Sequence, residues 1–96
     1  MAYTDANLLR GVDLGYNCSL WLYDTLDAAA TVDTSAYFTG EALKKLRKGD
    51  IILRRTWGTT IYTGTVSTVG LHVVLTNDGT TANVTDALAL TMTDTD

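Results

Sequence analysis

The residue usage of this 96-residue chain favours strands over helices along most of its length. Threonine is the commonest residue, Glu41 is the only glutamate, and proline is absent. Threonine is β-branched and stiff at χ1, and it suits a half-buried pleated surface. We therefore expect a mainly β protein, a small antiparallel β-barrel or sandwich, in a single domain over residues 1–96.

Alternating apolar residues mark the expected strands. In residues 17–23 (NCSLWLY), leucines occupy one face and Trp21 and Tyr23 the other. This pattern predicts a strand that is covered on both sides, or one whose aromatic face meets a partner. Further along, residues 51–93 predict an antiparallel meander of four or five strands, with a break at Gly70 and a turn at 77–79.

One short α-helix is expected at about residues 40–48, between the first strand and the meander. Thr39 is a suitable N-cap, Leu43 and Leu46 share one face, cations follow at the C-terminal end, and Gly49 ends the helix. The segment before it, 24–40, is expected to be a loop with an extended piece at Thr31–Asp33. Residues 1–16 are expected to form either one helical turn ending at Gly11 or an N-terminal arm.

The charge of the chain is unevenly distributed. Its net charge is −4, yet six of its seven basic residues lie between Lys44 and Arg55. These cations complement a helix C-terminus, form half of a charged protein interface, or bind nucleic acid. The acidic remainder of the chain argues against nucleic acid and against an anionic membrane.

No catalytic pattern is legible in the sequence. His72 is the only histidine, and we expect it on the outer face of a strand; Cys18 is alone, so we expect it to be a small buried side chain in no intrachain disulfide. We expect no catalytic, cofactor-binding or metal-binding residues. A small enzyme or carbohydrate-binding domain that uses Trp21, Trp57 and the Asp-rich loop is the open alternative, and it predicts a concave pocket with convergent polar groups.

Several residues are candidates for contact with a protein partner. Tryptophans often anchor interfaces, an N-terminal arm can order on a neighbour, and the two adjacent arginines are the cations that a helix terminus explains least. The predicted interface residues are Tyr3, Leu8, Leu9, Trp21, Arg54, Arg55 and Trp57.

Residues 20–56 resemble a group of small virion proteins of tailed bacteriophages that are encoded near the major capsid protein. The shared pattern is an aromatic strand, then DAAATV at 27–32, the pair Tyr37-Phe38, and a short amphipathic helix ending in KGDII at 48–52. The threonine-rich strands with NDGT at 77–80 are also similar to that group.

The resemblance implies a non-enzymatic capsid decoration (cement) protein that binds the outside of the assembled head and stabilises it. Its partner would be the major capsid protein, its own state a homo-oligomer, favouring a trimer, and its location the virion surface. No signal peptide or membrane segment is expected, so synthesis in the host cytoplasm follows. The alternatives are a head-fibre base or other virion attachment module, and a small nucleic-acid-binding module using residues 44–57.

Overall fold

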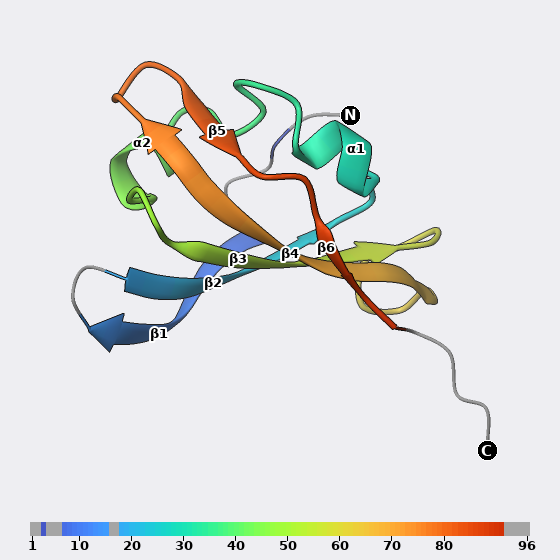
Figure 1. The fold of residues 1–96 in the computed structure, drawn as a ribbon. Coiled ribbons are helices and arrows are strands. Elements are labelled where there is room, and N and C mark those ends of the chain that lie inside the picture. Colours follow the sequence, from blue (N-terminus) through green and yellow to red (C-terminus); the bar gives the residue numbers. More distant parts are fainter. Residues whose placement is uncertain (1–2, 4–6, 16–17, 92–96) are drawn as a thin grey trace.

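The protein folds into a single sheet with two short helices on one side (Figure 1). The computed structural model describes residue 3 and residues 7–15 and 18–91. Its elements in chain order are β1 (Leu8–Gly15), β2 (Cys18–Thr25), α1 (Ala29–Val32), α2 (Ala42–Lys45), β3 (Ile51–Trp57), β4 (Val66–Asn77), β5 (Ala82–Val84) and β6 (Leu88–Leu90). The expectation of a small, mainly β fold is confirmed.

The sheet has the strand order β1-β2-β3-β4-β5, and β6 also pairs with β4. Every pair is antiparallel except β2–β3, which is parallel, so the expectation of a wholly antiparallel sheet is wrong at this pair. Parallel neighbours need a long crossover, and residues 26–50 provide it with both helices. Among the described strands no pairing joins β1 to β5 or β6, so the sheet is curled but open.

Helix α2 is shorter than the expected helix at 40–48, because backbone groups of the expected last turn form hydrogen bonds with Asn77 and Asp50 instead of with one another. The side chain of Asn77 donates to the carbonyl oxygens of Leu43 and Leu46, at 3.0 and 2.7 Å. The backbone N–H of Arg47 donates to Asp50 at 2.9 Å, and Leu46 is already extended. Thr39 is not the N-cap, since Glu41 takes that position without a side-chain capping bond.

Three other local expectations are wrong. The piece at 31–33 is not extended, because residues 29–32 form α1 and bury Val32 completely. Residues 59–65, which lie within the expected meander, are not strand. Trp57 pairs with Val66, and the residues between them form the loop that connects β3 to β4. Gly70 does not break a strand but lies within β4.

The N-terminal region contributes to the sheet rather than forming a separate arm. Residues 8–15 are strand β1, an edge strand whose partner is β2. Tyr3 packs on the core, with its ring 5.6 Å from that of Tyr23. The other residues of the expected arm, at 1–2, 4–6 and 16, lie outside the described part of the chain.

The core lies between the sheet and the two helices, and aromatic rings form its centre. Tyr3, Tyr23, Tyr37 and Phe38 contact one another at centroid distances of 5.1–6.3 Å. Tyr37 donates its hydroxyl proton to Asp27 at 2.6 Å, so Tyr23 must donate to Tyr37 in the 2.7 Å contact between their hydroxyls. The pair Tyr37-Phe38 is therefore part of the core.

Asp50 joins the crossover to the sheet through a fully buried carboxylate. It accepts hydrogen bonds from the backbone N–H of Ser19 (3.0 Å), the indole N–H of Trp21 (3.0 Å) and the backbone N–H of Arg47 (2.9 Å). Its own carbonyl accepts from Val74 N–H at 2.8 Å. One side chain thus fixes the start of β3 against β2, and its backbone fixes β3 against β4.

We predict that Asp50→Asn lowers the free energy of unfolding by about 3 kcal/mol, because an amide nitrogen then faces buried N–H donors. Urea denaturation followed by tryptophan fluorescence measures this. Asp86→Asn, at an exposed aspartate, is the matched control and should change stability by less than about 0.5 kcal/mol. Equal effects of the two substitutions would contradict the role given to Asp50.

Candidate interaction surface and buried polar centre

The face of the sheet that points away from the helices carries a straight row of five leucines, one from each of five strands. The register places Leu9 opposite Leu22, Leu22 opposite Leu53, Leu53 opposite Leu71 and Leu71 opposite Leu88. The end members, Leu9 and Leu88, are 52% and 65% exposed. None of the described helices lies on this side (Figure 1). We call these five residues the leucine row.

A second apolar row runs beside the leucine row. It consists of Val12, Leu20, Ile51 and Val73, which also face one another across the strands. Val12 and Val73 are exposed. Single exposed apolar residues are ordinary, but a contiguous apolar patch on a small protein marks a surface that associates with something.

A third row on the same face places a charged pair next to the leucines. Asp24 lies opposite Arg55, which lies opposite Val69 and then Leu90. Arg55 binds the Asp24 carboxylate with two donors, Nε at 2.6 Å and Nη2 at 2.9 Å. The two charges on this part of the face therefore neutralise each other.

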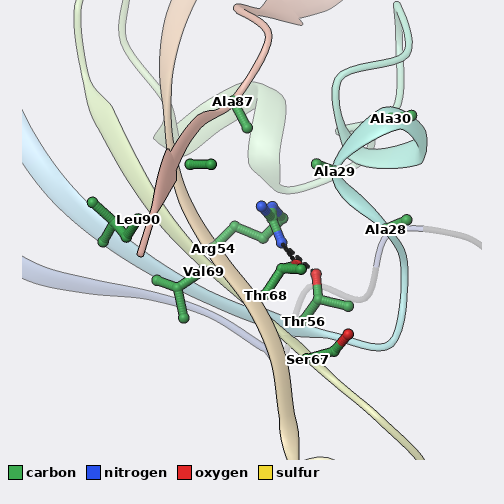
Figure 2. Close-up of a pocket in the computed structure, with 11 residues that line it drawn as sticks. Ala28, Ala29, Ala30, Arg54, Thr56, Ser67, Thr68, Val69, Ala87 and Leu90 are labelled. Carbon is green, nitrogen blue, oxygen red and sulfur yellow. Dashed lines mark hydrogen bonds between the residues drawn. The ribbon is translucent and has the colours of Figure 1, made fainter. Parts of the chain in front are cut away.

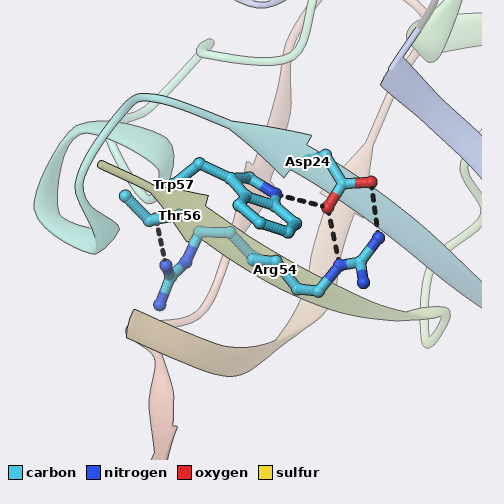
Figure 3. A network of polar contacts seen from close by, with 5 residues as sticks. Asp24, Arg54, Thr56 and Trp57 are labelled. Atoms are coloured by element: carbon cyan, nitrogen blue, oxygen red, sulfur yellow. Dashed lines mark hydrogen bonds and ion pairs between the residues drawn. The ribbon is translucent and has the colours of Figure 1, made fainter. Parts of the chain in front are cut away.

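Asp24 is also bonded to Trp57, whose indole N–H donates to it at 3.0 Å (Figure 3). Burial by itself would raise the pKa of Asp24, but hydrogen bonds from Arg55, Trp57 and Tyr62, together with the charge of Arg55, hold that pKa below its ordinary value. The Arg55 guanidinium also stacks on the Trp57 ring, 5.4 Å from its centroid. The pair is thus a fixed structural ion pair at neutral pH.

On the opposite face of the sheet, Arg54 is buried, with only 1% of its surface exposed. Its guanidinium donates through Nε to His72 Nε2 at 3.1 Å and through Nη1 to the hydroxyls of Thr56 and Thr68 (Figure 2). Its partner on the adjacent strand β4 is Gly70, and a Cβ at that position would come within 2.8 Å of Arg54 Nη2. Glycine at this strand position therefore makes room for the guanidinium.

The contacts of His72 fix its tautomer. Its Nδ1 lies 2.9 Å from the carbonyl oxygen of Thr85 and must carry the proton, so Nε2 is the acceptor for Arg54. Burial lowers the pKa of His72, and the Arg54 charge adds to this effect; the Thr85 carbonyl and the carboxylates of Asp33 and Asp86 oppose it without reversing it. His72 is neutral and fully buried, and the expectation of a histidine on the outer face is wrong.

The structure separates the seven predicted interface residues. Leu9 belongs to the exposed leucine row and Arg55 to the same face. The others are wholly or mostly buried within the chain: Tyr3, Leu8, Trp21, Arg54 and Trp57. In β2 the aromatic side faces the core and the leucine side is open, which is the reverse of the interface expected from the sequence.

Most residues of the candidate surface were not identified from the sequence. Leu22, Leu53, Leu71 and Leu88 lie in four different strands, and only the strand register aligns them. The alternating leucines of residues 17–23 are the one sequence signal of this surface. The opposite side of the same strand carries larger aromatic residues, and the sequence-based prediction places the interface there instead. Cys18 is half-buried rather than buried, and its thiol contacts the Gly49 carbonyl at 3.7 Å.

No protein-family model, no curated protein and no solved structure matches this chain. In the described part of the chain, no three histidine, cysteine or acidic residues gather as a metal-binding group. None of its described helices is long and apolar enough to cross a membrane. The described residues thus combine an apolar sheet face that none of the described helices covers with a buried cation, Arg54.

We predict that the protein loses stability between pH 7 and pH 5, before its carboxylates titrate. The unfolded chain takes up a proton at His72 near pH 6.5, whereas the folded chain resists it, so the unfolding free energy falls by up to about 1.4 kcal/mol per pH unit in this window. His72→Gln keeps an acceptor for Arg54 and should flatten this slope. Urea titrations at each pH measure it, and identical slopes in both proteins would refute the assignment. The contribution of Asp24 is lost only below its ordinary pKa of 3.8.

Proposed function

We propose that this chain is a non-enzymatic structural protein of a bacteriophage virion, a decoration protein that binds the outside of the assembled head. The resemblance of residues 20–56 to small phage virion proteins suggests the setting. The observation that carries the proposal is the leucine row, which gives the monomer an apolar sheet face that no described helix covers. Such a face suits a module whose work is assembly.

The leucine row is covered by other copies of this chain. Fully burying an exposed leucine contributes about 1.5–3 kcal/mol. The exposed ends Leu9 and Leu88, with the remaining exposed area of the three half-buried leucines between them, therefore supply a driving force for association. The only charges in the rows beside it, Asp24 and Arg55, are already bonded to each other. Copies can therefore approach without opposing like charges, although the whole chain carries −4. Three rows meeting around a common axis form the trimer that we favour.

In this proposal, helix α2 and the loop after it contact the capsid shell. They lie on the other side of the sheet from the leucine row (Figure 1) and carry the exposed cations Lys44, Arg47 and Lys48. With the leucine row buried between copies, this basic end faces outward. Its charge would steer docking onto an acidic surface of the shell.

The two alternatives have less support. A nucleic-acid site over residues 44–57 needs its cations on one surface, but Arg54 is buried and Arg55 is bonded to Asp24 on the opposite face of the sheet. A head-fibre base would use the same apolar face for assembly, and no feature of the described residues favours a head-fibre base over a decoration protein.

We predict that Leu9→Asp and Leu88→Asp each convert the oligomer into a monomer, because each places a charge at an exposed end of the row. Sedimentation velocity with light scattering measures the mass. Ser35→Asp adds the same charge at an exposed turn and should leave the mass unchanged. Two outcomes would contradict self-association through the leucine row: a wild-type protein that is monomeric at all concentrations, or an oligomer that persists in both leucine variants.

We also predict that the purified protein co-sediments with assembled phage shells but not with free capsid subunits. Lys44→Glu combined with Lys48→Glu should weaken this binding and reduce its dependence on salt, while the oligomer mass stays constant. An oligomer that does not co-sediment with candidate shells would agree with the proposed self-association but would contradict the decoration role.

A further inference from the structure

A cavity of about 530 Å³ opens on the helix side of the sheet, between α1, β4 and β6 (Figure 2). Small apolar side chains form most of its wall, and hydroxyl groups and Arg54 form the rest. The wall residues are Ala28, Ala29, Ala30, Arg54, Thr56, Ser67, Thr68, Val69, Ala87, Ala89 and Leu90. It contains none of the five residues of the leucine row, although at the β6 edge its wall includes Val69 and Leu90, which belong to the Asp24–Arg55 row of the other face.

Arg54 brings a positive charge to this cavity, and the Asp33 carboxylate acts on that charge electrostatically without forming an ion pair with it. Its Nε and Nη1 are bonded to neutral groups, His72 and two threonines, whereas Nη2 has no hydrogen-bond acceptor among the described residues. No carboxylate of those residues forms an ion pair with it. Buried charges in proteins are normally paired, and arginine stays protonated even when burial opposes it. Among the described residues, however, no carboxylate is in direct contact with the Arg54 guanidinium.

A second donor lies beside Nη2. The hydroxyl of Thr68 accepts from Arg54 Nη1 at 3.1 Å, so its own proton is free to be donated. The hydroxyl of Thr56 cannot serve in this way, because it already donates to the Asp27 carbonyl at 2.7 Å. One guanidinium nitrogen and one hydroxyl thus remain to bind an oxyanion.

We propose that this cavity binds a carboxylate carried on a short aliphatic chain. The carboxylate oxygens accept hydrogen bonds from Arg54 Nη2 and Thr68 Oγ1, and the methylene groups lie against the alanines and Leu90. One cation in a mostly apolar wall suits a monoanion better than a phosphate dianion, which would leave charge unneutralised. This site does not depend on the proposed virion role.

The test is a titration of the ¹⁵N-labelled protein with sodium butyrate, sodium hexanoate and the uncharged hexanamide, followed by amide chemical shifts. Saturable shifts at residues 68, 87 and 89 with the carboxylates are expected. Affinity should rise roughly fourfold for each added methylene. Hexanamide that binds as well as hexanoate, or no saturation up to the solubility limit of hexanoate, would overturn the proposal.

Three substitutions locate the binding. Thr68→Val keeps the side-chain shape and should weaken hexanoate about tenfold by removing a donor to a charged group. Ala89→Leu fills the cavity from an exposed strand position and should abolish binding, whereas Ser35→Leu, at an exposed turn, should not change it. Arg54→Gln should also abolish binding; if it does not fold, the other two variants decide. Unchanged affinity in both would place any binding elsewhere.

The same chemistry can come from a free acid or from the end of a peptide chain. A tetrapeptide ending in leucine, offered with a free carboxylate and with a C-terminal amide, separates the two sources. Tighter binding of the free-carboxylate peptide than of hexanoate assigns the cavity to a chain terminus, and the reverse assigns it to a small acid. Equal binding of peptide acid and peptide amide would count against the proposal.

Discussion

The buried carboxylate of Asp50 is the interaction on which the rest of the structure depends. It accepts from Ser19 and Trp21 in β2 and from Arg47 in the crossover, and Asp50 immediately precedes β3. It thereby sets the parallel register of β2 and β3. A slip of one residue would exchange the two faces of β3, so both the leucine row and the Arg54 site require this register.

The two faces of the sheet carry different kinds of residue because side chains alternate along each strand. In β3, Leu53 and Arg55 point to the open face, and Ile52 and Arg54 point to the core. The adjacent arginines therefore have unrelated roles. Arg55 is neutralised by Asp24 on the open face, whereas Arg54, beside the cavity, forms no ion pair with a described carboxylate.

The proposed assembly surface and the proposed internal site lie largely on opposite faces of the sheet. Association through the leucine row would bury apolar surface that is unfavourable in water, and it would leave accessible the part of the cavity wall that lies on the helix side of the sheet. The neutral His72 links the site to pH, because a proton on it would remove the acceptor for Arg54 and place a second cation beside it. Self-association and occupation of the cavity can therefore be measured independently.

The sequence by itself determined the strand-rich class, the turn at 77–79, the position of one helix and the alternation of leucines and aromatics in 17–23, since all of these arise from local periodicity and side-chain shape. Only the tertiary structure decided which side of that strand is open, that Gly70 makes room for a guanidinium, and that His72 is internal. These features rest on strand register and on the parallel crossover. They bring together residues about thirty positions apart, such as Asp24 and Arg55, and no local pattern encodes such distant pairings.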